Sequence, residues 1–183
     1  QTLSPSLHRE LSEIETRIHA YADTTFNINS PKQLAQVLFD KLELHTARHR
    51  RTTTGQRTTK ESELKKLQGK HPIIDEILRY RELAKLLSTY VDSFPKMVAR
   101  DGRLRTTFLQ TGTTTGRLAS RDPNLQNIPI RSEDGRALRR GFVAAPGYQL
   151  VSIDYSQIDL RAAAILSGDS HLIEIFQRNE DVH

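Results

Sequence analysis

The chain has 183 residues, of which 36% are hydrophobic, so it can form one or two folded domains and is not a disordered tail. It contains no cysteine, which excludes disulfides and thiolate metal sites and fits a reducing compartment. The first ten residues lack an initiator Met and a signal-peptide core, and no apolar run approaches the length of a membrane span. We therefore expect a soluble fragment or processed piece that does not contact a membrane.

The net charge of +5 is concentrated in one stretch, residues 45–60. This stretch contains five basic residues and no acidic residue, so it accounts for the whole excess: Arg48, Arg50, Arg51, Arg57 and Lys60. A loop rich in Thr, Gly and Arg cannot bury itself, which favours a solvated, flexible tip. Basic side chains also neutralise nucleic-acid phosphates, and Thr hydroxyls donate hydrogen bonds to them, which favours a phosphate-binding arm. Composition alone leaves both interpretations open.

The N-terminal part of the chain has the spacing of amphipathic helices. Over residues 3–21, apolar residues recur every three or four positions, the period of one helical face. Ser30 precedes Pro31, and Gln33 follows three positions after the serine. This pattern predicts a capping box, with a helix that runs to about Leu44.

Two further helices are expected before residue 98. Residues 60–67 predict a short helix, and Pro72 begins a long one that should end near Pro95. The sequence therefore predicts an all-helical first region, residues 1–98, with the basic stretch as a loop within it.

From residue 99 the composition changes, and β-branched residues interrupted by glycines become frequent. A turn is expected at residues 101–102, followed by extended segments. The segments GFVAA and YQLVSID predict a hairpin whose second, buried strand ends at Asp154. Ser156 should cap a helix over residues 157–166, and a last helix should begin at residues 169–170 and run to the chain end. The fold class is therefore α+β.

Two aspartates follow the predicted hairpin. A carboxylate at the end of a core strand, such as Asp154, can hold a divalent cation on a rigid base, although Asp also commonly begins a turn. Asp159 lies inside the predicted helix, and its spacing from Ser156 is that of a capping box. The two carboxylates are therefore expected to face different ways.

The segment TGTTTGRLASRDPNLQNIP, residues 111–129, is dense in turn residues and amides. One interpretation is a loop held by its own hydrogen bonds, because Asp, Asn and Pro form turns. The other is a minor-groove reader, because Arg, Asn and Gln reach the acceptors that every base pair presents there.

Several motifs together resemble one family. TTTGRLASRDPNLQNIPIRS, LVSIDYSQIDLRAAAILSGD and EDVH are similar to segments of the family A DNA polymerases of the bacterial DNA polymerase I type, including palm motif A. FNINSPKQLAQVLFDKLEL and HPIIDEILRYRELAKLLSTYVD resemble the thumb of that family. The resemblance covers essentially the whole chain. It implies a helical thumb of long antiparallel helices at 1–98, with the basic tip loop 45–60, and a partial palm at 99–183 with antiparallel strands and two helices.

The resemblance also implies roles in two-metal nucleotidyl transfer. Asp154 would be the catalytic motif A ligand of Mg²⁺, together with the backbone carbonyl of Tyr155. The incoming deoxynucleoside triphosphate would meet Gln157, Asp159 and His183. Primer–template duplex DNA would be bound through two groups of residues. In the palm these are Arg117, Asn124, Gln126, Asn127 and Arg131; in the thumb they are Asn27, Asn29, Ser30, Lys85, Arg48, Arg50, Arg51, Arg57 and Lys60.

Two departures from the family pattern limit what the chain is expected to do. The chain ends at His183, before a fingers helix or a second palm carboxylate of a His-Asp-Glu hairpin could occur. We therefore expect the 183-residue chain not to polymerise, and template-directed extension by the purified chain would contradict this. Asp159 also stands where the family usually has a Glu that excludes ribonucleotides. The shorter side chain predicts easier ribonucleotide entry in the full-length parent, and equal ribonucleotide incorporation after Asp159→Glu would argue against it.

Other classes of function remain. The chain could be a non-catalytic duplex-binding module that reuses the thumb and palm. A metal-dependent nuclease built on Asp154 is disfavoured, because two metals need a second carboxylate in the same cleft. For the parent we expect a monomer in the bacterial cytoplasm, associated with the nucleoid and acting in replication and repair.

Overall fold

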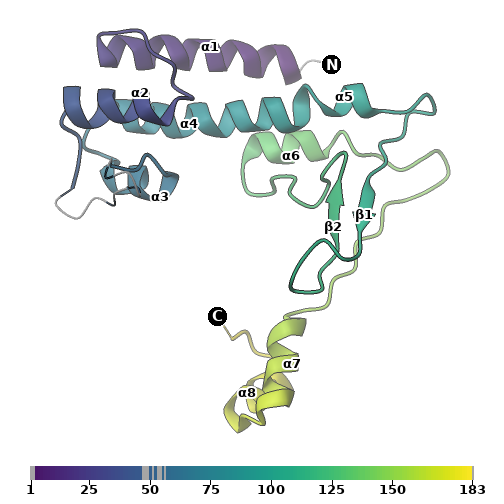
Figure 1. Cartoon of the computed structure of the whole chain (residues 1–183). Coiled ribbons are helices and arrows are strands. Elements are labelled where there is room, and N and C mark those ends of the chain that lie inside the picture. Colours follow the sequence, from purple (N-terminus) through teal and green to yellow (C-terminus); the bar gives the residue numbers. More distant parts are fainter. Residues whose placement is uncertain (1–2, 47–49, 51, 53–54, 56, 183) are drawn as a thin grey trace. The chain divides into compact units, whose positions relative to one another are not determined.

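A computed structural model of the chain describes residues 3–46, 50, 52, 55 and 57–182, and its contacts divide the chain into two units, Gln1–Gly141 and Phe142–His183 (Figure 1). The fold is α+β, with many helices and one small antiparallel sheet among the described residues. The predicted domain boundary after residue 98 stays a prediction. Within the described ranges, no helix has both the length and the apolar character that crossing a membrane would require.

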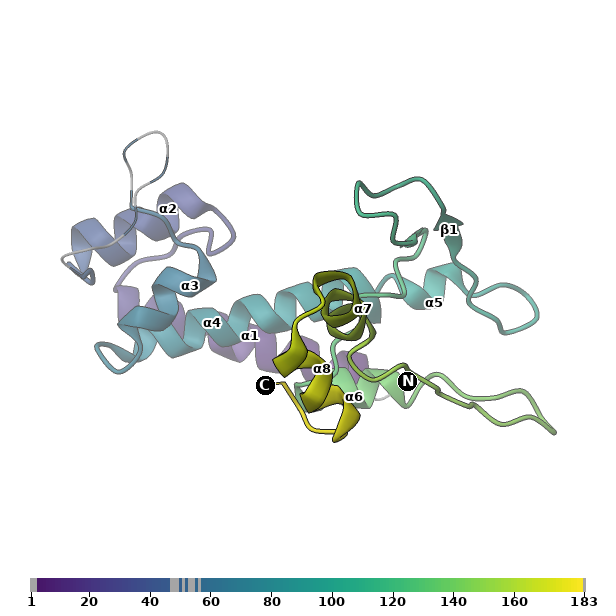
Figure 2. The ribbon, with the colours of Figure 1, turned by 90° about the horizontal axis from the view of Figure 1, so that it is seen from below.

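Two long helices form the framework of the first unit. Helix α1, Leu3–Ala22, lies along α4, Pro72–Leu86, in both views (Figures 1 and 2), and its bounds confirm the helix predicted over 3–21. Each helix buries one stripe, which is the packing that its apolar period predicted. The buried side chains are Leu7, Ile14 and Ile18 of α1, and Ile73, Ile74, Ile77 and Leu83 of α4. Outside this core, Arg17 of α1 forms a two-point ion pair with Glu76 of α4, at 2.8 and 2.9 Å.

Helix α2, Pro31–Ala35, begins as predicted, but its capping contacts differ in one respect. The Ser30 hydroxyl accepts a hydrogen bond from the backbone N–H of Gln33, as expected for an N-cap. The Gln33 side chain, however, accepts from the N–H of Asn27 at 2.7 Å, whereas a capping box would use the N–H of Ser30. The helix continues as the π-helical segment η1, Gln36–Lys41, and ends there, slightly before the predicted Leu44.

The short helix expected over 60–67 is present as α3, Glu61–Leu64, continued by the 3₁₀ segment η2, Lys65–Leu67. Helix α4 continues as the π-helical segment η3, Leu87–Val91. Pro95 was predicted to mark the end of the long helix, but it lies in the first turn of a separate helix α5, Phe94–Met97. That position suits proline, because the first N–H groups of a helix have no partner inside it.

The rest of the first unit is a two-stranded sheet and one helix. Strand β1, Thr107–Leu109, pairs antiparallel with β2, Ala119–Arg121, with Phe108 opposite Ser120. The predicted turn at residues 101–102 precedes it, with Gly102 at φ +76°. Helix α6, Glu133–Arg139, follows, and its N-cap Ser132 accepts from the N–H of Gly135.

The second unit shows that one prediction was wrong. The turn at Gly147 is present, but residues 148–154 form no strand, so Asp154 does not end a buried strand. Leu150, Val151 and Ile153 are 71 to 91% exposed. A strand needs ladder partners and a covered face, and the described residues supply neither here, so an isolated hairpin would be marginal at best.

Two helices complete the second unit, and the start of the first one corrects another prediction. Helix α7, Ile158–Ser167, has Gln157 as its N-cap residue, at φ +51° and ψ +38°. Because this left-handed residue comes directly before the helix, Ser156 does not cap it, and the predicted Ser156–Asp159 capping box does not form. Helix α8, Ser170–Gln177, is capped by Asp169 as predicted, and it ends before the chain does.

Candidate nucleic-acid interface

A groove in the first unit brings together residues that are far apart in the sequence. It has a volume of about 820 Å³ and is lined by α3, η2, α4, η3 and the segment 127–132 that precedes α6. Lys85 of α4, Asn127 and Arg131, all three predicted to bind DNA, line this one groove. The segment 127–132 forms one side of it and is called the palm-side wall below.

Two buried side chains of α4 and η3 form part of the groove lining. Leu86 and Tyr90 line it and are almost fully buried, and the Tyr90 ring packs edge-on against Phe94 at 5.3 Å between centroids. The Tyr90 hydroxyl donates a hydrogen bond to the backbone carbonyl of Asn127. Burial raises the pKa of Tyr90, so this hydroxyl keeps its proton and remains a donor at neutral pH.

Most of the charges that line the groove are neutralised by a neighbour. Lys65 pairs with Glu61 at 2.6 Å, and Arg79 contacts three carboxylates. Among the described residues, no carboxylate lies within ion-pair distance of Lys85 or Arg131. Arg81, the remaining cation that lines the groove, donates to the carbonyl and the hydroxyl of Thr59. Among the described residues, Lys85 and Arg131 are therefore the groove cations whose side chains could bind an anionic ligand such as a nucleic-acid phosphate.

The predicted thumb residues at 27–30 form a hydrogen-bonded loop at the start of α2. The Asn27 side chain accepts from the N–H of Asn29 at 2.9 Å. The Asn29 side chain donates to the hydroxyl of Tyr80 on α4 at 3.2 Å, which ties the loop to the framework. Burial raises the pKa of Tyr80. The loop therefore has a fixed shape on α4, as a surface that meets duplex backbone would need.

The amide-rich segment before the palm-side wall is held by its own side chains. The Asn124 carbonyl oxygen accepts from the Ser120 hydroxyl at 3.2 Å and from the N–H of Gln126 at 2.9 Å. The Gln126 side chain donates to the carbonyl of Leu118 at 3.0 Å. These contacts favour the interpretation of a self-bonded loop for Asn124 and Gln126. Arg117 is exposed, and its carbonyl accepts from the Thr113 hydroxyl at 2.7 Å.

The base of the basic loop is closed by contacts to α3 and α4. Thr58 donates its N–H to the carbonyl of Arg50 at 3.0 Å, and Arg81 of α4 donates to the carbonyl and hydroxyl of Thr59. Lys60 directly precedes α3 and is exposed. Arg48 and Arg51, also predicted to bind DNA, lie outside the described residues.

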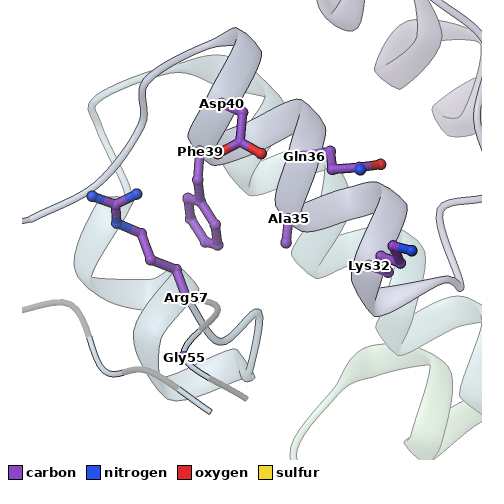
Figure 3. A pocket seen from close by; sticks show the side chains of 7 residues that line it. All are labelled: Lys32, Ala35, Gln36, Phe39, Asp40, Gly55 and Arg57. Atoms are coloured by element: carbon purple, nitrogen blue, oxygen red, sulfur yellow. The ribbon is translucent and has the colours of Figure 1, made fainter. Parts of the chain in front are cut away.

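Arg57 also lines a smaller pocket against α2 and η1 (Figure 3). This pocket has a volume of about 210 Å³, and the side chains of Lys32, Gln36, Phe39 and Asp40 surround it together with Arg57. Lys32 is a cation that the sequence analysis missed. The pattern that could have indicated it is its place directly after Ser30 and Pro31, in a segment already assigned to duplex contact.

The predicted catalytic segment lies in the second unit. Asp154, Tyr155 and Asp159 are exposed, and Asp159 stands in the first turn of α7. The left-handed turn at Gln157 is held by the Gln157 side chain, which donates to Asp181 at 2.7 Å. His183, the third predicted nucleotide-binding residue, lies outside the described residues.

Arg161 supports the same turn from inside α7. Its Nε donates to the carbonyl of Ser156 at 3.0 Å, and its guanidinium lies over the ring of Phe176 on α8, 4.8 Å from the centroid. Arg161 and Asp181 were not predicted as site residues from the sequence. Nothing in their local sequence indicates that they meet the Ser156–Gln157 turn.

The described residues do not complete a magnesium site. Mg²⁺ takes about six oxygen ligands, and the carboxylate of Asp154 with the carbonyl of Tyr155 would supply three at most. Within residues 3–46, 50, 52, 55 and 57–182, no group of three acidic or histidine side chains could hold a metal ion. A metal at Asp154 would therefore need ligands from water, substrate or other residues of a larger protein.

Comparison with known proteins identifies the family. A model of DNA polymerase family A matches residues 1–183, and the chain belongs to that family. It is 50% identical over its full length to the thermostable DNA polymerase I of Thermus thermophilus, and it covers 22% of that protein. DNA polymerase I of Deinococcus radiodurans is also 50% identical, with 19% of its length covered. The chain thus spans about a fifth of the length of these relatives.

The fold matches a solved structure of the same family. The POL domain of Pol1 from M. smegmatis, in complex with DNA primer-template and dNTP, superposes with a TM-score of 0.89 at 41% identity. The match covers 99% of this chain and 32% of that chain. The predicted α+β fold class is confirmed, and the division into thumb and partial palm stays a prediction.

Proposed function

We propose that this chain is the thumb and part of the palm of a DNA-directed DNA polymerase, and that it grips primer–template duplex DNA in the groove beside α4. One observation carries the proposal: Lys85, Asn127 and Arg131 line a single groove, and no described carboxylate lies within ion-pair distance of the two cations. The loop at 27–30 and the basic tip loop extend the phosphate-binding surface. The likeness to a polymerase domain in complex with DNA primer-template and dNTP supports the same assignment.

The parent protein, in this proposal, carries out template-directed nucleotidyl transfer from deoxynucleoside triphosphates during bacterial replication and repair. It acts as a monomer in the cytoplasm, at the nucleoid. Mg²⁺, when bound, supplies charge stabilisation for in-line displacement. Asp154 and the carbonyl of Tyr155 would contribute ligands, while Gln157, Asp159 and His183 would meet the triphosphate.

The 183-residue chain itself binds duplex DNA but does not extend a primer. Asp154 is the metal carboxylate assigned within it, and two-metal chemistry needs a second one. A primer-extension assay with the purified chain and Mg²⁺ tests this directly. Duplex binding without extension is the expected result, and extension would contradict it.

The groove is tested by the salt dependence of duplex binding. Each phosphate that a cation neutralises contributes close to one unit to the slope of log K against log salt, so Lys85→Gln and Arg131→Gln should each lower it by about one. The matched control is Arg9→Gln, which removes one exposed cation of α1 that does not line the groove. Fluorescence anisotropy with a labelled primer–template measures all three variants. Equal slopes in all of them, or a slope near zero in the wild type, would contradict the proposal.

A further inference from the structure

Arg79 of α4 lines the groove, yet all of its guanidinium nitrogens form ion pairs or hydrogen bonds within the protein. Its Nε and Nη2 contact Glu10 of α1 at 2.9 and 2.7 Å. Its Nη1 contacts Asp134 of α6 at 2.8 Å and Glu82 of α4 at 3.3 Å. All three nitrogens therefore have a carboxylate partner, and the guanidinium joins three helices.

The electrostatics of this cluster do not favour a phosphate. One guanidinium faces three carboxylates, so the cluster carries a net negative charge and would repel an anion. Burial alone would lower the pKa of Arg79, but the hydrogen bonds to Glu10 and Asp134 raise it above its ordinary value. The charge of Arg79 is thus neutralised by its carboxylate neighbours and does not attract an anionic ligand in the groove.

The partner that matters for the groove is Asp134, because α6 carries the palm-side wall. Arg139 of α6 donates to the carbonyls of Ile128 and Pro129, each at 3.1 Å, and Arg136 donates to the carbonyl of Arg131 at 2.6 Å. Gly135 lies so close to Pro129 that a Cβ there would come within 2.6 Å of the proline Cβ. The wall and α6 therefore move together.

We propose that Arg79 is a positioning residue for duplex binding: through Asp134 it holds α6, and with it the palm-side wall, at a set distance from α4. The inference rests on the proposed function of the groove. Arg131 would then reach a phosphate from the wall while Lys85 does so from α4. At the other end of the wall, the Tyr90 hydroxyl of η3 donates a hydrogen bond to the Asn127 carbonyl. Arg79 would therefore set the spacing at the end that joins α6.

The test compares Arg79→Gln and Asp134→Asn with the control Arg17→Gln. Arg17 also joins α1 to α4 by an ion pair, but it does not line the groove. Positioning predicts that Arg79→Gln and Asp134→Asn each weaken duplex binding about threefold to tenfold, as expected for coupled contacting groups, and that the double variant is no weaker than either single one. Arg17→Gln should bind as the wild type does.

Asp134→Asn separates this proposal from a direct phosphate contact. If Arg79 were a phosphate ligand, removing a competing carboxylate would strengthen binding and steepen the salt slope. Stronger duplex binding in Asp134→Asn would therefore overturn the proposal. Circular dichroism of each variant verifies that its helices are intact.

A second measurement does not depend on DNA. Amide hydrogen exchange at Ile128, Ile130 and Arg131 should be faster in Arg79→Gln and Asp134→Asn than in the wild type and Arg17→Gln. If the wild type does not bind duplex DNA, the proposed function fails, and exchange alone then decides the positioning role. Unchanged exchange in both variants would overturn it.

Discussion

The two units of the chain differ in how they hold their proposed functional residues. In the first unit, the groove residues lie on α4 and η3, whose apolar stripe is buried with that of α1: Ile14, Ile18 and Ile77 are at most 1% exposed. In residues 142–182, Ala164 is the only buried residue that the structure describes, and Ile153 and Leu166 are 91% and 87% exposed. The chain therefore combines a proposed DNA-binding groove fixed by its own core with a proposed metal-binding carboxylate that lacks such a core.

This difference shows how far each unit positions its proposed functional residues through its own contacts. Lys85 and Arg131 have their spacing set by ion pairs and a core within one unit. Asp154 precedes a left-handed turn that is held by two polar contacts, through Gln157 and Arg161. Three predictions test this comparison.

The largest expected effect is on stability. Ile77→Ala removes a fully buried side chain of α4 and should lower the free energy of unfolding by about 2 to 5 kcal/mol, through lost transfer energy and a cavity. Ile165→Ala removes the same atoms from α7, where the side chain is 76% exposed, and should change it by less than about 0.5 kcal/mol. Urea unfolding followed by circular dichroism measures both. Equal losses would show that the second unit has a core of its own.

A smaller effect is expected at the turn before α7. Arg161→Met removes the hydrogen bond to the Ser156 carbonyl and the contact with Phe176, which should cost about 0.5 to 1.5 kcal/mol of local stability. The control is Arg178→Met, which removes only an exposed i, i+4 pair with Glu174. Amide exchange in the first turn of α7 should accelerate in the first variant alone. Equal exchange rates in the two variants would show that Arg161 does not stabilise the turn before α7.

The smallest effect is a pH response at the edge of the first unit. Hydrogen bonding by Arg105 lowers the pKa of Asp101 to about 2. Because this pKa is depressed in the folded state, the contribution of the pair is present above about pH 4 and is lost as the pH falls through 2. A carboxyl NMR titration should show this midpoint, and Arg105→Gln should move it up toward the ordinary value. A midpoint already near 4 in the wild type would contradict the assignment.

Much of the helical framework could be predicted from the sequence, because helix formation depends on contacts between residues three and four apart. The apolar period gave α1 and α4, and the Ser30 and Asp169 caps marked two helix starts correctly. The hairpin ending at Asp154 was predicted wrongly, because strand propensity is realised only where a partner strand is present. The capping role of Ser156 was wrong because Gln157 adopts a left-handed conformation, which residue types alone do not indicate.

The candidate site was likewise predicted only in part from the sequence. The residues Lys85, Asn127, Arg131 and Asp154 were assigned from ordered motifs that resemble one family, and the family itself is confirmed. Their individual roles remain proposals. For Asn124 and Gln126, the loop contacts favour one of the two interpretations that the sequence left open.

The sequence by itself determined the family, the apolar faces of the helices and the residue types that could bind phosphate. Each of these depends only on the local order and spacing of residues. Only the tertiary structure shows which of the basic side chains have a carboxylate neighbour. Arg79 and Lys85 stand six positions apart on one helix and look alike in the sequence. Carboxylates from α1, α4 and α6 neutralise the first, while no described carboxylate pairs with the second. Charge pairing across helices depends on distances that only the folded chain sets, so the sequence alone could not distinguish Arg79 from Lys85.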